Sequence, residues 1–238
     1  MDFNLEQRLE FIKVRVKESH TEGVVIGISG GKDSAVVTAL CVKALGKENV
    51  LGITMPCGSI SKDAEHARLV AEKFGIEFLE VDLKASFDAV CNNMPDMNLS
   101  ELAIANIKPR LRMITLYTIA QSKNRLVVGT DNLSEMVMGY FTKWGDGAYD
   151  INPLSDLTVS EVLAFGKTLG VPAPILEKAP SAGLWEGQTD EKEMGVTYAE
   201  IEEYIKTGKT NSVAQSIIEI AYKKTQHKRE MPYFFRSK

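Results

Sequence analysis

Residues 27–34 form the segment of this sequence with the most evident chemistry, and they read Gly-Ile-Ser-Gly-Gly-Lys-Asp-Ser. The adjacent glycines allow close approach of the backbone, and the two serines can donate hydroxyl hydrogen bonds to phosphate oxygens. Asp33 would repel a phosphate unless a cation lay between them, so it indicates a Mg²⁺ ligand. The pattern is neither a Walker loop nor a Gly-x-Gly-x-x-Gly turn. It predicts a site for the pyrophosphate end of ATP, with cleavage between the α and β phosphates. The alternative is a tight turn with Asp33 or Ser34 near the helix N-cap.

A second candidate site lies at residues 129–135, which read Gly-Thr-Asp-Asn-Leu-Ser-Glu. Thr130 and Asp131 have side chains that can cap the helix expected next, which is the structural interpretation. In the functional interpretation, Glu135 lies in the first turns of that helix, close to Asp33. Two carboxylates from different strand ends, with phosphate oxygens and water, suit Mg²⁺.

Two charged groups are ambiguous by themselves. The first group lies in one Gly-rich stretch and consists of Lys143, Asp146 and Asp150. The second lies near the C-terminus and consists of His227, Lys228 and Arg229. A charge cluster in a loop is usually solvated surface, and a basic segment near a terminus is as often a solvated tail as a binding group. Their local sequence therefore leaves both interpretations open.

Alternating apolar and amphipathic runs predict the elements that position these motifs. Strands are expected at residues 23–28, 50–55, 77–81 and 125–129, and helices at residues 5–16, 34–45, 62–74, 84–92 and 98–122. Strands that alternate with helices predict a parallel, doubly wound α/β sheet covered on both faces, a three-layer sandwich. Ligands of such sheets lie beyond the carboxyl ends of the strands, where both phosphate motifs fall. Met55, at the end of the second strand, is a candidate for the adenine pocket.

The long helical stretch at residues 98–122 contains Pro109, which predicts a kink or a second helix starting there. It has more apolar residues than one buried helix face needs. Either core packing or a dimer interface could account for the surplus. Residues 141–148 and 179–195 are rich in glycine, serine, proline and charge, and we expect them to act as lids rather than plain surface loops.

Composition narrows the class of protein. The 238 residues carry a net charge of -4, which argues against nucleic-acid binding through bulk charge. No run reaches the ~18 apolar residues of a membrane helix, and the acidic, polar start is unlike a secretory signal. The 3 cysteines are widely spaced, which favours reduced thiols and a cytoplasmic location.

The segment at residues 29–34 resembles the PP-loop of N-type ATP pyrophosphatases, and further strings resemble the NAD synthetase family. These strings are Arg110-Leu111-Arg112-Met113, residues 129–132 with Glu135, residues 142–147, residues 150–154, residues 178–182 and residues 227–229. They occur in the family's order and cover most of the chain. The resemblance implies an adenine nucleotide alpha hydrolase-like fold and a single ligase domain over residues 1–238.

The implied reaction is the amidation of deamido-NAD⁺. ATP adenylates the nicotinate carboxylate and releases pyrophosphate, and ammonia then attacks the acyl-adenylate to give NAD⁺ and AMP. The resemblance also implies Mg²⁺ as cofactor and a homodimer with residues 98–122 at its interface. Only residues 1–22 precede the first strand, so we expect no glutaminase domain and free ammonia as the nitrogen donor.

Residue roles follow from the same resemblance. The ATP-binding set is Gly27, Ile28, Ser29, Gly30, Gly31, Lys32, Asp33, Ser34, Thr130 and Ser181. The deamido-NAD⁺ set is Arg110, Lys143, Asp150, His227 and Lys228. Asp33 and Glu135 would hold magnesium, and with Lys143 they form the expected catalytic group.

One position departs from the family. Where the family commonly has a lysine that contacts an ATP phosphate, this chain has Val159, which cannot make that contact. Two other functions therefore stay under consideration: a tRNA-modifying sulfur transferase with a PP-loop, and a nucleotide sensor without activity. The first commonly uses a cysteine pair and a basic RNA surface, whereas this sequence has no Cys-x-x-Cys and a net charge of -4. The second is opposed by the presence of Asp33, Glu135 and Lys143.

Overall fold

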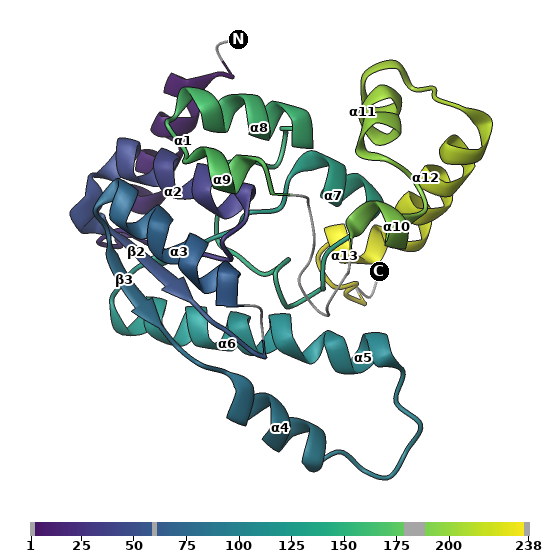
Figure 1. Ribbon diagram of the computed structural model, residues 1–238, viewed down its shortest axis with the longest axis horizontal. Coiled ribbons are helices and arrows are strands. Elements are labelled where there is room, and N and C mark those ends of the chain that lie inside the picture. Colours follow the sequence, from purple (N-terminus) through teal and green to yellow (C-terminus); the bar gives the residue numbers. More distant parts are fainter. Residues whose placement is uncertain (1–2, 59–60, 179–188, 236–238) are drawn as a thin grey trace.

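Four short parallel strands form the central sheet of the computed structural model, which describes residues 3–58, 61–178 and 189–235 (Figure 1). The strands are β1 (Val24–Gly27), β2 (Val50–Thr54), β3 (Glu77–Glu80) and β4 (Leu126–Val128), in the order β3-β2-β1-β4. Val25 is in register with Leu51 on one side and Val127 on the other. All pairs are parallel, which confirms the predicted sheet. β1 and β4 are shorter than predicted at both ends, and β2 and β3 only at their C-terminal ends.

Helices cover both faces of this sheet, because successive side chains of a strand point to opposite faces. Val24 and Ile26 face one apolar cluster, which includes residues of α1 (Leu5–Glu18), α2 (Lys32–Leu45), α3 (Ser61–Phe74), α8 (Val159–Thr168) and α9 (Ala173–Leu176). Val25 faces a second cluster, with α4 (Lys84–Asn92) and α6 (Ile107–Ser122) on that side. The predicted three-layer α/β sandwich is confirmed.

Two boundaries differ from the sequence-based expectation. Helix α2 begins at Lys32 and not at residue 34, so the segment expected to bind phosphate already contains the first helical turn. The long stretch divides at Asn106 into α5 (Glu101–Ala105) and α6, which begins at Ile107. Pro109 lies in the first turn of α6, where its missing N–H costs no helical hydrogen bond.

A third apolar cluster lies beyond the sheet and contains Met138, Val159, Tyr198, Ile201 and Ile218. It joins α7 (Leu133–Met138) and the start of α8 to α11 (Tyr198–Thr207) and α12 (Ser212–Lys224). The remaining elements are η1 (Lys47–Asn49), α10 (Asp190–Met194) and α13 (Gln226–Arg229). Figure 1 shows α10, α11 and α12 grouped beside α7, away from β3. Within the described ranges, no helix is long and apolar enough to cross a membrane.

Candidate active site

The loop after β1 is held by its own serines. The Ser34 hydroxyl donates to the carbonyl of Gly31 at 3.0 Å, and the backbone N–H of Ser29 donates to Ser34 Oγ at 3.3 Å. Gly30 has a φ of +77°, and a Cβ there would lie 2.4 Å from the carbonyl oxygen of Asp63, so only glycine fits. The N-cap of α2 is Gly31, without a side-chain cap, and Asp33 and Ser34 follow it in the first helical turn, near the N-cap as the structural alternative expected.

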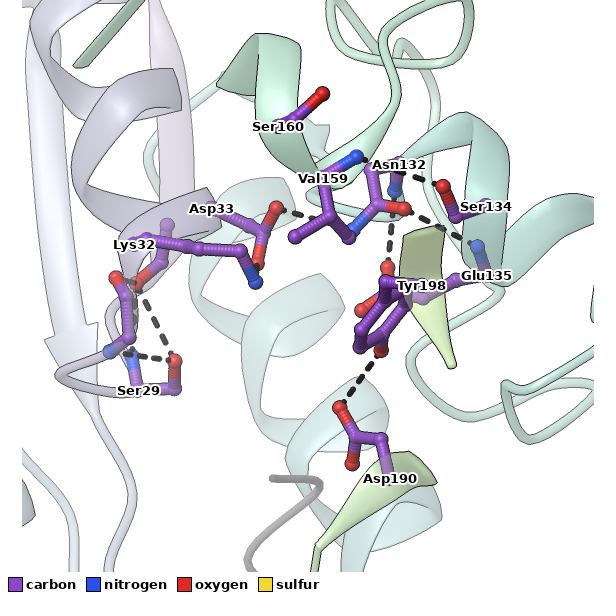
Figure 2. Close-up of polar contacts among 12 residues, drawn as sticks. Ser29, Lys32, Asp33, Asn132, Ser134, Glu135, Val159, Ser160, Asp190 and Tyr198 are labelled. Atoms are coloured by element: carbon purple, nitrogen blue, oxygen red, sulfur yellow. Dashed lines mark hydrogen bonds and ion pairs between the residues drawn. The ribbon is translucent and has the colours of Figure 1, made fainter. Parts of the chain in front are cut away.

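Asp33 connects this loop to the segment after β4. Its Oδ1 accepts a hydrogen bond from Asn132 Nδ2 at 3.2 Å, and its Oδ2 pairs with Lys32 Nζ at 2.8 Å (Figure 2). β1 and β4 are adjacent strands, so their carboxyl ends bring the two loops together. The sequence-based expectation that Glu135 lies near the first loop is consistent with this contact.

The helix after β4 is capped by Asn132, so the structural interpretation that gave this role to Thr130 or Asp131 is wrong. Asn132 Oδ1 accepts from the N–H of Glu135, and Glu135 Oε2 accepts from the N–H of Asn132 at 2.9 Å. This reciprocal pair is a capping box, and it fixes the orientation of the Glu135 carboxylate at the start of α7. Glu135 thus has a structural contact as well as its place in the site.

An acidic cavity of about 150 Å³ lies between the two loops. Five carboxylates line it: Asp33, Asp131, Glu135, Asp146 and Asp190. Burial, and then the neighbouring Asp33, raise the pKa of Glu135 to about 8. Burial, followed by the charge of Asp146, raises the pKa of Asp131 well above its usual value. The site therefore holds more negative charge than it can keep ionised without a cation.

These residues fit a bound magnesium ion. Carboxylate oxygens are the hard ligands that Mg²⁺ prefers. Asp131 Oδ2 is buried and makes no hydrogen bond to any other described part of the chain. Among the described residues, no three His, Cys, Asp or Glu side chains lie close enough to hold a metal alone. A metal here would need further oxygen ligands from phosphate and water, which is how Mg²⁺ usually binds beside nucleotides.

A larger cavity of about 240 Å³ adjoins the acidic one and shares Ser29, Thr130 and Asp146 with it. Gly27, Met55 and Arg112 also line it, which is consistent with the expectation that Met55 lies near a bound adenine. Arg112 Nε donates to the carbonyl of Met55 at 3.2 Å, and burial lowers the pKa of this guanidinium. A mostly apolar hollow that opens beside an acidic phosphate site suits a nucleotide.

The ambiguous charged groups come together in space. Lys143 Nζ donates to the backbone carbonyl of His227, and Arg110 donates to the carbonyl of Lys143 at 3.4 Å. Lys228 Nζ donates to the carbonyls of Gly139 and Phe141, both at 2.7 Å. The C-terminal basic group is thus not a solvated tail, because it is docked on the segment that follows α7.

The remaining predicted residues are placed as follows. Asp150 Oδ2 accepts from the N–H of Val127 at 2.7 Å, and its Oδ1 accepts from the Tyr117 hydroxyl at 3.2 Å. It therefore lies beside β4, away from the acidic cavity. Ser181 and most of the expected second lid lie outside the described residues.

The first expected lid, residues 141–148, is a folded turn. Thr142 N–H donates to Asp146 Oδ1 at 3.0 Å, and the N–H groups of Gly145 and Gly147 donate to the Thr142 carbonyl. Phe141 and Thr142 are buried. Several residues of the turn line the larger cavity, so its movement on ligand binding stays a prediction.

Sequence reasoning missed several members of the site. Asn132 has a visible signal, since Asn followed three residues later by Glu is a capping-box pattern. Asp190 and Tyr198 have none: Asp190 lies in the stretch 179–195 that was expected to be a lid, and the Tyr198 hydroxyl donates to its Oδ2 at 2.8 Å. Burial and the charges of Glu135 and Asp190 raise the pKa of Tyr198, so the hydroxyl stays protonated.

Val159 lies at the edge of the same site, as the first residue of α8. Its N–H donates to Ser134 Oγ at 3.4 Å (Figure 2). Its side chain is buried in the apolar cluster with Met138 and Tyr198. Position 159 thus contributes packing and no charge.

Comparison with known proteins shows similarity to a single family over nearly the whole chain. The model of the NAD synthase family matches residues 4–232. A relative from Carboxydothermus hydrogenoformans, named NH(3)-dependent NAD(+) synthetase, is 44% identical over 230 residues, which cover 95% of this chain and 94% of the relative.

Two solved structures are also similar to this chain over nearly their whole lengths. The structure of NMN synthetase from Francisella tularensis has a TM-score of 0.94 at 38% identity and covers 98% of this chain and 97% of its own. The NH3-dependent NAD synthetase from Campylobacter jejuni, determined with a nitrate ion, has a TM-score of 0.82 at 31% identity and covers 99% and 100%.

Proposed function

The chain belongs to the NAD synthase family, and we propose that its two adjoining cavities carry out the ATP-dependent amidation of deamido-NAD⁺ by ammonia. Members of this family are ligases that form a C–N bond, and they take part in NAD biosynthesis. The observation that carries the assignment is the joining of the phosphate loop to the segment after β4 through Asp33 and Asn132. We also propose that the enzyme acts in the cytoplasm, where its substrates ATP and deamido-NAD⁺ are expected. We assign the activity to one domain over residues 1–238.

The reaction makes two chemical demands: the charge on the departing pyrophosphate must be stabilised, and the nicotinate carboxylate must be held in line with the α-phosphorus of ATP. A carboxylate is a poor acyl donor until one of its oxygens becomes a good leaving group, which attack on the α-phosphorus of ATP achieves. Negative charge then builds on the departing pyrophosphate, and positioned N–H donors and cations stabilise it. Holding the nicotinate carboxylate in line with that phosphorus supplies much of the remaining acceleration.

The phosphate loop and the acidic cavity serve the first demand. The N–H groups and hydroxyls of residues 27–34 and Thr130 would bind the phosphates of ATP, together with Ser181. Asp33 and Glu135 would hold Mg²⁺, with Asp131 beside them. When bound, Mg²⁺ neutralises charge on the phosphate oxygens. The apolar part of the larger cavity, near Met55, would take the adenosine.

A basic group from three separate segments serves the second demand. Lys143, Arg110 and His227 lie together and would bind the phosphates of deamido-NAD⁺, and Asp150 would be a further contact. Lys228 is held by two backbone carbonyls, so in the ligand-free chain it fixes the segment around Phe141. In this assignment Lys228 acts by closing that segment over the dinucleotide.

The purified chain is expected to form NAD⁺ from ATP, Mg²⁺, deamido-NAD⁺ and ammonium, at a rate that rises with pH through the neutral range. Only NH₃ has the lone pair that attacks an acyl-adenylate, and its share of total ammonium grows as pH rises. The measurement is NAD⁺ formation at fixed total ammonium from pH 6 to 9, with glutamine as the control donor. A rate independent of pH, or equal turnover with glutamine, contradicts ammonia as the limiting donor.

The same assay separates a second candidate substrate. The Francisella tularensis neighbour is titled an NMN synthetase, and nicotinate mononucleotide carries the same carboxylate as deamido-NAD⁺. We expect the larger dinucleotide to be preferred, because the relatives named NAD⁺ synthetases match at 44% identity over nearly the full chain. A higher kcat/KM for the mononucleotide would reassign the substrate and leave the ligase chemistry intact.

A homodimer is expected, with α5 and α6 at its interface. These helices expose large apolar side chains, since Leu102 is 54% and Ile114 is 56% exposed. Covering such a surface with a second copy removes apolar area from water. Sedimentation velocity at micromolar concentration should give a dimer, and Ile114→Asp should shift it to monomer. Ile220→Asp on α12, which is 65% exposed, is the matched control and should stay dimeric. A wild-type monomer contradicts the assignment.

A further inference from the structure

Lys32 is a buried lysine whose ammonium contacts Asp33, one of the acids that line the acidic cavity. It is the first residue of α2, and only 5% of the residue is exposed. Its Nζ lies 2.8 Å from Asp33 Oδ2. Figure 2 shows the side chain running from the phosphate loop toward the middle of the site, with its nitrogen beside the Asp33 carboxylate. A charged lysine is rarely buried without a strong electrostatic reason.

The reason is the negative charge around it. Burial opposes the charge of Lys32, and the Asp33 carboxylate, whose Oδ2 lies 2.8 Å from Nζ, offsets that cost. Asp33 shares the wall of the acidic cavity with Glu135 and Asp190. Among the described residues that line the acidic cavity, none is a lysine or arginine. Lys32 is therefore the cation through which this cluster of acids is balanced in the ligand-free chain.

Asp33 cannot keep this arrangement while it binds a metal ion. Its Oδ1 is held by Asn132 and its Oδ2 by Lys32, so both carboxylate oxygens have partners. A divalent cation held by Asp33 would repel the ammonium and compete with it for the carboxylate. Lysine has a flexible four-carbon stem and three donors that can be redirected. The polyphosphate chain of ATP brings new negative charge to the same place, and Val159 supplies no charge to meet it.

We propose that the Lys32 ammonium holds Asp33 in the ligand-free enzyme and turns to the β and γ phosphates of ATP when a metal–ATP complex occupies Asp33. This inference rests on the proposed function, since it assumes that ATP binds in this site. In this proposal the Lys32 side chain contacts the ATP phosphates, in addition to the contacts made by the backbone N–H groups of the loop. Lys32 is thus the phosphate-binding lysine of this chain.

Binding of ATP and of AMP to the full-length protein tests this role. Isothermal titration is done with Mg²⁺ and without deamido-NAD⁺, so that no turnover occurs. Lys32→Met should weaken ATP binding about 10- to 100-fold, the loss typical of a hydrogen bond to a charged group. AMP lacks the β and γ phosphates, so its affinity should stay within about 2-fold of wild type. Lys32→Arg keeps the charge and should retain most ATP affinity.

Lys43→Met is the matched control, because Lys43 lies on the same helix with an exposed side chain. It should bind both nucleotides as wild type does. Equal losses of ATP and AMP binding in Lys32→Met would mean that Lys32 only supports the fold, which overturns the proposal. Unchanged ATP binding overturns it as well. In both cases the chain could still form NAD⁺, so the proposed function would stand or fall separately in its own assay.

Discussion

Asp33→Asn is expected to lower kcat for NAD⁺ formation by on the order of 1000-fold, which corresponds to about 4 kcal/mol of activation free energy. The carboxylate is the side chain of the phosphate loop that would hold Mg²⁺ on the departing pyrophosphate. An asparagine amide is uncharged, so it binds the metal weakly and leaves the charge of the leaving group unbalanced. Rapid-quench measurement of adenylate formation identifies the affected step, which should be adenylation.

The variant should fold, because asparagine has nearly the same shape. Its amide oxygen can accept from one of the two partners of Asp33, Asn132 Nδ2 or Lys32 Nζ, which contact different oxygens of the carboxylate. Asp88→Asn is the matched control, since Asp88 also pairs with a nearby lysine, Lys84, but on the exposed surface of α4. It should keep the wild-type rate. An Asp33→Asn enzyme with near-wild-type adenylation would refute the magnesium role.

Glu135→Gln should reduce adenylation by at least about 100-fold, the lower range for losing one group that stabilises developing charge. Glutamine also serves at this place in a capping box, so the turn that orients α7 is retained. The variant thus removes charge and little else. Raising Mg²⁺ concentration should recover part of the rate, because the defect is in metal affinity. A loss that no Mg²⁺ concentration relieves would argue for a structural role of Glu135 alone.

Stability measurements separate these two roles. The folded-state pKa of Glu135 is raised to about 8, so the folded chain keeps this proton to higher pH than the unfolded chain does. Its contribution to stability therefore falls as pH rises from the unfolded pKa of about 4.3 to about 8. The neutral glutamine lacks this cost, so the Tm of metal-free Glu135→Gln at pH 8 should be no lower than that of wild type. Glu200→Gln, in the exposed capping box of α11, is the control for the substitution itself.

Much of the fold could be predicted because its signals are local. The apolar runs that became β1, β2, β3 and β4 were visible as contiguous segments, and so were the helices between them. The starts of some helices were predicted at the wrong residue. Helix α2 begins at Lys32 because Gly31 is its N-cap, and this depends on backbone angles that sequence patterns do not reveal. The capping of α7 by Asn132 was missed for a similar reason, since three neighbouring polar residues were equally able to cap.

The candidate site was predictable only in part. The phosphate loop is contiguous, so residue types and spacing were enough to indicate ATP and a cation. Lys143 and His227 are different, because each looked like solvated surface in its own segment. Their contact joins residues 84 positions apart, and only the packing of the C-terminal helices against the region after α7 creates it.

The sequence by itself determined the fold class, the phosphate loop and the family, because each is encoded by short runs or by motifs in a recognisable order. The tertiary structure decided which of those side chains meet. It joined Asp33 to Asn132 across 99 positions and placed Asp190, which accepts a hydrogen bond from Tyr198, on the wall of the acidic cavity. It also placed the buried Lys32 ammonium against Asp33. The physical reason is that charge balance in a buried site depends on distances between segments, and these distances are set by sheet order and helix packing rather than by any local pattern.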